Sequence, residues 1–162
     1  VSTIVIGIEA IEQENGEFMA FTDNGRNETN KNAIAWAMQA EKLGAGELLI
    51  TSVDNEGTGS GINEKLLNEI SNNVSIPVVF HGGIGKKEQV LKILESNSFI
   101  SGLAICSLFH YDFINIQRRL DGYDEEGNID FLKSKRMYGK IDPLGIKDLK
   151  DYLILHSNRI RD

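Results

Sequence analysis

One arrangement recurs four times along these 162 residues: a short apolar run, a loop, and a segment with helical periodicity. The apolar runs are rich in β-branched residues, as buried parallel strands are, and predict strands at Thr3–Ile8, Glu47–Ser52, Ile76–Phe80 and Ser101–Ile105. The helices predicted after them are Asn30–Leu43, Asn63–Asn72, Lys87–Glu95 and a fourth that begins within Cys106–Tyr111. Four such units predict an α/β fold with parallel strands, right-handed crossovers and a ligand site at the strands' C-terminal ends.

Two further features complete the predicted organisation. Asn15–Gly16 is a turn signal, and it predicts a hairpin whose second arm is Glu17–Phe21. Polar residues and turn signals at Arg118–Asn128 predict an excursion from the regular pattern, and Ile146–Leu155 is the predicted final helix. The predicted divisions are one domain over 1–162, an irregular insertion at 112–145, and a closing helix and tail at 146–162.

Composition argues against several classes of protein. The formal charge of −7 disfavours a generic nucleic-acid binder, because such binding depends on Lys and Arg that neutralise phosphates. No apolar run approaches the roughly 18 residues that a membrane span needs, and no secretory signal pattern opens the chain. The single cysteine, Cys106, excludes an internal disulfide framework, so we expect a cytoplasmic protein. The three histidines lack metal-ligand spacing, and no metal or other cofactor is predicted.

Three loops with small residues follow three successive predicted strands. Asp54–Gly61 and His81–Gly85 are rich in glycine, and Cys106–Ser107 stands where the fourth helix begins. Backbone N–H groups in such loops can surround an anion without any charged side chain. Because the three loops converge at one end of the sheet, they predict a phosphate site there.

Two carboxylates lie near the same end of the predicted sheet. Glu9 follows the first strand, and Glu56 lies in the first glycine loop. Each side chain could act as a general acid or base, and each could equally be a residue that ties down a loop. We expect Cys106 to pack as a small apolar residue, since no partner for a nucleophile stands at useful spacing.

At this point the chain resembles a known family, the cyclase subunit of imidazole glycerol phosphate synthase. The resemblance lies in the segments Gly44–Thr58, Ile76–Gly85 and Ser107–Tyr111, in that order. It extends from Thr3 to Tyr111 and implies the C-terminal half, four βα units, of a (β/α)8 barrel. The resemblance also implies a lyase of histidine biosynthesis that acts on a phosphorylated small molecule with ammonia from a glutaminase subunit.

The resemblance also assigns roles to individual residues. It implies that Glu9 is the general acid, that Thr51 is a hydroxyl at the barrel mouth, and that Glu56 is catalytic. The residues that it implies for phosphate binding are Gly57, Gly82, Gly83, Cys106 and Ser107. The sequence departs from the family with Glu in place of Asp at positions 9 and 56, His81 in place of Ser, and Cys106 in place of Ala.

These departures leave three hypotheses open. The first is a truncated cyclase with no turnover of its own, because the family's other catalytic aspartate lies on strand one. The second is a related protein for ammonia-dependent amidation of bacterial surface sugars, and the third is a non-catalytic half-barrel that binds phosphate. In all three, the open strands Thr3–Ile8 and Ser101–Ile105 predict a homo-oligomer. The residues predicted to face the barrel interior are Val5, Leu49, Val79 and Leu103.

Overall fold

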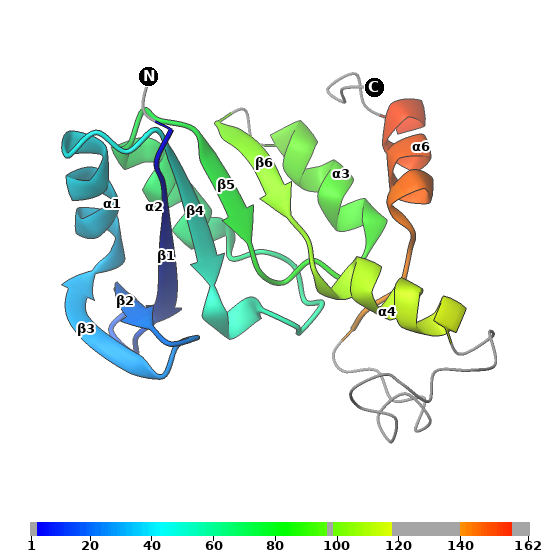
Figure 1. Cartoon of the computed structure of the whole chain (residues 1–162), viewed down its shortest axis with the longest axis horizontal. Coiled ribbons are helices and arrows are strands. Elements are labelled where there is room, and N and C mark those ends of the chain that lie inside the picture. Colours follow the sequence, from blue (N-terminus) through cyan, green and yellow to red (C-terminus); the bar gives the residue numbers. More distant parts are fainter. Residues whose placement is uncertain (1–2, 97–98, 118–139, 157–162) are drawn as a thin grey trace.

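The computed structural model describes residues 3–96, 99–117 and 140–156, and its centre is a six-stranded sheet (Figure 1). The strands follow the order β3-β2-β1-β4-β5-β6. Their bounds are β1 Val5–Glu12, β2 Phe18–Thr22, β3 Asn27–Asn32, β4 Glu47–Ser52, β5 Val78–His81 and β6 Ile100–Ala104. The pairs β1–β4, β4–β5 and β5–β6 are parallel, which confirms a mostly parallel α/β fold.

An antiparallel hairpin extends the sheet beyond β1. The turn predicted at Asn15–Gly16 is confirmed, because β1 pairs with β2 through Glu9–Glu12 and Phe18–Phe21. The sequence analysis did not predict β3, which pairs antiparallel with β2. The first predicted strand was too short, and Glu9 therefore lies inside β1 rather than at its end.

The helices begin at side chains that cap them. Helix α1, Ala33–Lys42, begins later than predicted, because Asn32 belongs to β3 and its side chain accepts hydrogen bonds from the N–H groups of Ile34 and Ala35. Asn63 caps α2, Glu64–Asn73, in the same way. An N-cap of this type stabilises a helix by about 1 kcal/mol. The other helices are α3 Lys87–Ser96, α4 Ser107–Gln117 and α6 Ile146–His156.

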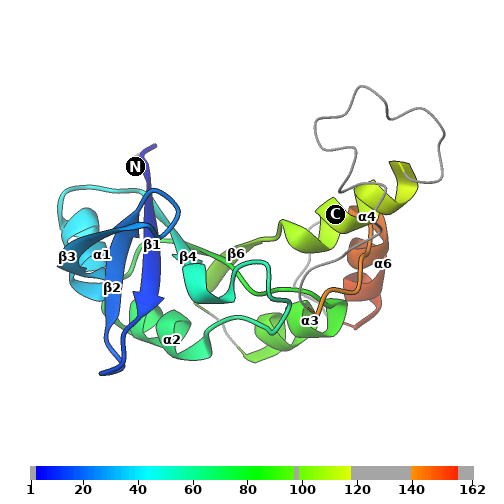
Figure 2. The same ribbon diagram turned by 90° about the horizontal axis from the view of Figure 1, so that it is seen from below.

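One face of the sheet forms the core. Side chains alternate along β4, so that Leu48, Ile50 and Ser52 are buried and the residues between them are half-buried. Figure 2 shows α2 and α3 along one side of the sheet, and their buried side chains join the same cluster as Leu48 and Ile50. The opposite face, which we call the open face, keeps more solvent exposure; the residues on its central strands are Val5, Gly7, Glu9, Leu49, Thr51, Val79, His81, Gly102 and Ala104.

Two predictions about later segments need correction. Leu103 pairs with the buried Phe80 and packs against the core, so its predicted place on the interior face was wrong. The irregular segment was predicted to begin at 112, but α4 continues to Gln117. Residues 118–139 lie outside the described part of the chain. Helix α6 was predicted correctly except for its last residue. It contacts α3. In the described residues, no helix has the length and apolar character to cross a membrane.

Candidate phosphate site

The C-terminal ends of the four parallel strands lie along the lower edge of the sheet in Figure 1. The loops after β4 and β5 meet at this edge, and α4 begins beside them. They enclose one small pocket, which we call the loop pocket. Its lining residues are Glu56, Gly57, His81, Gly82, Gly83, Ile84, Ala104, Ile105, Cys106 and Ser107. Six of the predicted site residues are thus brought together; they are Glu56, Gly57, Gly82, Gly83, Cys106 and Ser107.

Two glycines allow the loops to approach so closely. Gly82 and Gly83 have φ angles of +107° and +96°, in the left-handed region that side chains disfavour. A Cβ at Gly83 would collide with the carbonyl oxygen of Gly61, whose N–H donates to the Gly83 carbonyl oxygen at 2.8 Å. The loops after β4 and β5 are therefore joined backbone to backbone, which fixes the wall of the pocket.

A buried polar network holds the first loop in shape. The Ser52 hydroxyl is 2.9 Å from Oδ1 of Asn55, and Nδ2 of Asn55 donates to the Gly61 carbonyl oxygen at 2.9 Å. The loop is thereby closed on itself between its first and last residues. The sequence analysis did not single out Asn55, because an asparagine inside a glycine-rich loop has no spacing that marks such a role.

The loop pocket offers backbone donors rather than cationic side chains. Within the described part of the chain, the N–H groups of Gly83 and Ser107 donate to no carbonyl or side-chain oxygen. Ser107 is also the first residue of the eleven-residue helix α4, whose N-terminus carries a partial positive charge. No Lys or Arg belongs to the residues that line the pocket. This chemistry suits a small anion held by amides.

The other two predicted catalytic residues lie beside the pocket in one row. Strand pairing aligns Glu9 with Thr51, and Thr51 with His81, so their side chains share the open face. The Thr51 hydroxyl is 3.4 Å from Nδ1 of His81. The Glu9 carboxylate points into the β2–β3 turn, where it accepts a hydrogen bond of 3.0 Å from the Gly25 N–H. Oε2 of Glu9 therefore ties a loop, which is one of the two roles predicted for this carboxylate.

His81 is the site residue that the sequence analysis missed. Its Nε2 is 3.9 Å from Oε1 of Glu56, and its side chain keeps 20% of its exposure. The sequence analysis noted His81 at the start of the second glycine loop and in place of the family's serine, but it gave this side chain no role in the site. The pairing of β4 with β5 places His81 beside Thr51. This neighbourhood could be found only once the strand register was known.

Cys106 lies immediately before α4 and lines the loop pocket. Cys106 is exposed, so the expectation that it packs in the interior was wrong. No group of three or more metal-ligating side chains occurs within residues 3–96, 99–117 and 140–156. Cys106 lines the loop pocket together with Ser107.

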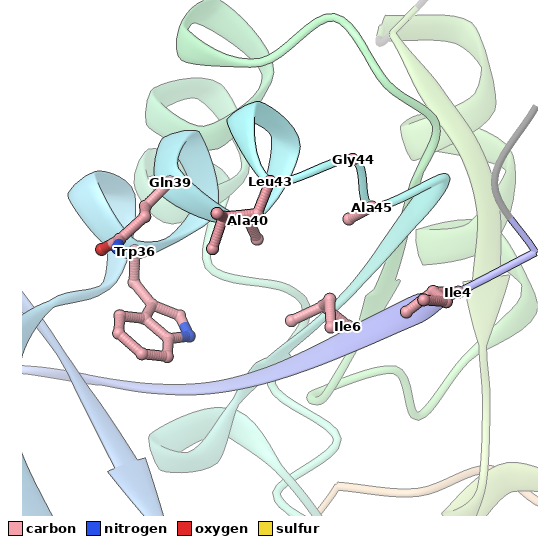
Figure 3. A pocket seen from close by; sticks show the side chains of 8 residues that line it. All are labelled: Ile4, Ile6, Trp36, Gln39, Ala40, Leu43, Gly44 and Ala45. Carbon is pink, nitrogen blue, oxygen red and sulfur yellow. The ribbon is translucent and has the colours of Figure 1, made fainter.

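A larger and more apolar pocket lies away from the strand ends. It occupies about 240 Å³ between α1 and the start of β1. Figure 3 shows Ile4 and Ile6 on one side, with Trp36 and Leu43 opposite. Its lining has no ionisable side chain, so we separate it from the candidate site.

Comparison with known proteins identifies a family model and several relatives that are similar to this chain. A family model described as "Histidine biosynthesis protein" matches residues 1–115. Imidazole glycerol phosphate synthase subunit HisF of Hydrogenobaculum sp. (strain Y04AAS1) is 41% identical over 126 residues, which are 78% of this chain and 49% of that protein. The subunit of the same name from Legionella pneumophila is 46% identical over 86 residues, which are 53% of this chain and 41% of that protein.

A third relative extends the same pattern. The subunit HisF of Bacillus cereus (strain G9842) is 39% identical over 114 residues, which are 70% of this chain and 45% of that protein. The chain thus spans about half the length of the curated relatives that it matches. Because the family model covers residues 1–115 of the 162, the chain belongs to the histidine biosynthesis protein family.

Proposed function

We propose that this chain is the C-terminal half of a (β/α)8 barrel of the imidazole glycerol phosphate synthase cyclase type. In this proposal the loop pocket binds one phosphate of a small-molecule substrate. The observation that carries it is the meeting of Gly57, Gly83 and Ser107 in a single pocket at the C-terminal ends of parallel strands. In barrels of this kind the loops after the last two strands commonly bind phosphate.

The row beside the pocket is where the chemistry would take place. A phosphate anchored by the loops would place the rest of the substrate over the open face, next to Thr51. Thr51 would orient the substrate by hydrogen bonding, and Glu9 and Glu56 would exchange protons with it. Ammonia would come from a glutaminase subunit. We propose no turnover by these residues alone, because the chain spans about half the length of its relatives and the resemblance implies that the opposing acid belongs to the other half.

Titration with inorganic phosphate tests the pocket, which both enzyme hypotheses share. In amide-resolved NMR, we expect phosphate to shift the signals of Gly57, Gly83 and Ser107. Ser107→Asp should weaken phosphate binding at least about tenfold, because it puts a carboxylate against the anion. Aspartate is favourable in the first turn of a helix, so the variant should stay folded.

Ser60→Asp is the matched control. Ser60 is exposed in the same glycine-rich loop and does not line the pocket, so this variant adds the same charge outside the site. Its phosphate affinity should stay within about twofold of the original chain, since exposed charges are screened by salt. Equal losses of phosphate affinity in the two variants, or no NMR shift at the three amides, would contradict the proposed site.

A further inference from the structure

The loop pocket has an unusual charge pattern for an anion site. Among the residues that the structure describes, Glu56 is the only acidic side chain that lines it, and His81 is the only lining side chain that can become a cation. When His81 is neutral, the side chains of the pocket carry one negative charge, which opposes an anion. When His81 is protonated, its charge cancels that of Glu56. The protonation of one residue therefore changes the side-chain charge of the pocket from −1 to zero, which removes the repulsion of an anion held by the amides.

The strand register holds His81 in position for this effect. His81 is the last residue of β5, and it is paired with Thr51 on β4 and Ala104 on β6. Its two ring nitrogens face the Thr51 hydroxyl at 3.4 Å and the Glu56 carboxylate at 3.9 Å. An ion pair at this separation, half shielded from solvent, couples more strongly than a fully exposed pair.

We infer that His81 is a specificity-determining residue that makes anion binding in the loop pocket depend on its protonation. The inference rests on the proposed function, because it uses the same pocket, and it adds a regulator that the family assignment does not contain. Histidine is the side chain that ordinarily changes charge between about pH 5 and pH 8. Anion affinity should accordingly rise as the pH falls through this range.

Other titratable groups around His81 are accounted for by their positions. Glu56 faces it directly, and Cys106 lies across the pocket at the start of α4. Glu9 lies on β1, on the far side of Thr51 from His81, and its carboxylate accepts a hydrogen bond from the Gly25 N–H. Asp54 accepts a hydrogen bond from the Glu12 N–H, outside the pocket.

Sulfate is the probe for this inference, because it remains a dianion throughout the range whereas phosphate changes its own charge. Its dissociation constant would be measured by calorimetry at about pH 5.5 and about pH 8. For the unmodified chain we expect about tenfold tighter binding at the lower pH, as one unit charge close to the anion produces. His81→Ser should reduce this difference to less than about twofold.

Three more variants complete the experiment. His156→Ser removes an exposed imidazole on α6, outside the pocket, and should keep the full pH dependence. Glu56→Gln removes the opposing carboxylate, so sulfate should bind at about pH 8 nearly as tightly as the unmodified chain does at about pH 5.5. His81→Gln, a second neutral substitution at the same position, keeps the test valid if His81→Ser fails to fold.

The outcomes separate the inference from the proposed function. If neither sulfate nor phosphate binds the unmodified chain at either pH, the phosphate site itself is wrong. If both anions bind but His81→Ser keeps the pH dependence, or Glu56→Gln leaves the affinity at high pH unchanged, the role of His81 is overturned. Loss of the pH dependence in His81→Ser alone would support the inference.

Discussion

Gly83 and Gly57 share a left-handed backbone but differ in the space around them. Their φ angles are +96° and +73°. A Cβ at Gly83 would collide with the Gly61 backbone, whereas a Cβ at Gly57 would meet nothing within 4 Å. We predict that Gly83→Ala lowers the free energy of unfolding by about 3 kcal/mol or more, since a backbone clash adds to the strain of positive φ.

Gly57→Ala isolates the conformational part of that cost. It should lower the free energy of unfolding by only about 1 kcal/mol, which is the usual penalty for a side chain in this conformation. Urea denaturation of both variants measures the difference. Equal losses would mean that the close approach of the loops after β4 and β5 contributes nothing to stability.

At the scale of single residues, the sequence predicted the pocket better than its surroundings. The loops that contain Gly57, Gly83 and Ser107 could be predicted to converge because they follow successive parallel strands, whereas the choice of these individual residues came from the family resemblance. His81 could not be assigned, because its relation to Thr51 depends on which residues of β4 and β5 pair. A lone histidine without metal-ligand spacing gives no signal until that register is known.

The hairpin shows why one element escaped prediction. β3 consists of Asn27–Asn32, whose residues are polar and mostly poor strand formers. It is a strand because β2 pairs with it, and the Thr29 hydroxyl donates to the Ala20 carbonyl oxygen at 2.6 Å. Pairing with β2 thus overrides the local propensity of β3. The four apolar strands, in contrast, could be predicted from their own residues.

The hairpin is tied to α2 by charged and polar contacts at Glu12. Nζ of Lys65 donates to Oε1 of Glu12 at 2.9 Å, and Nδ2 of Asn63 donates to Oε2 at 3.3 Å. These two hydrogen bonds, that of Lys65 first, lower the pKa of Glu12 below its ordinary value of 4.5. Because the folded-state pKa is lowered, the stabilisation is present above pH 4.5 and is lost as the pH falls through the lowered value.

Lys65→Met should therefore raise the pKa of Glu12 towards 4.5, because it removes the strongest donor. An NMR titration of the Glu12 side-chain carboxyl measures the change. Lys92→Met is the control, since it breaks a similar exposed pair, Lys92–Glu64 at 2.7 Å, without touching Glu12. A Glu12 pKa that does not move in Lys65→Met, or moves equally in both variants, would contradict the assignment.

For the whole molecule, three of the four residues predicted to face the barrel interior, Val5, Leu49 and Val79, lie on one face of the sheet, the open face. Leu49 and Val79 are half-buried on the open face, and Val5 there is 52% exposed. Leu103 was misplaced because the β5–β6 register shifts between Val78 and Val79. Such a shift moves the following side chains to the other face, and nothing in the sequence of β6 marks it.

The first sheet edge was only partly predicted. The hairpin covers β1 from Glu9 to Glu12, so the segment Val5–Ile8 pairs with β4 but has no strand on its other side in the described part of the chain. The apolar pocket of Figure 3 lies beside this segment. At the other end of the sheet, β6 is the last strand. The open face thus lies between two strand edges that can accept further strands.

We predict that this chain forms a homo-oligomer, most simply a two-fold dimer in which the open faces of two copies cover each other. Burying about 400 Å² of apolar surface contributes on the order of 10 kcal/mol, before association costs of similar size. Sedimentation equilibrium at micromolar concentration should therefore show a mass above that of the monomer. Val5→Lys should shift the equilibrium towards monomer, because it puts a charge on the open face. Phe113→Lys, at a residue with a similar exposure of 54% on α4, should leave the mass unchanged. A monomer mass for the unmodified chain would contradict the prediction and leave the open face of the isolated chain in contact with water.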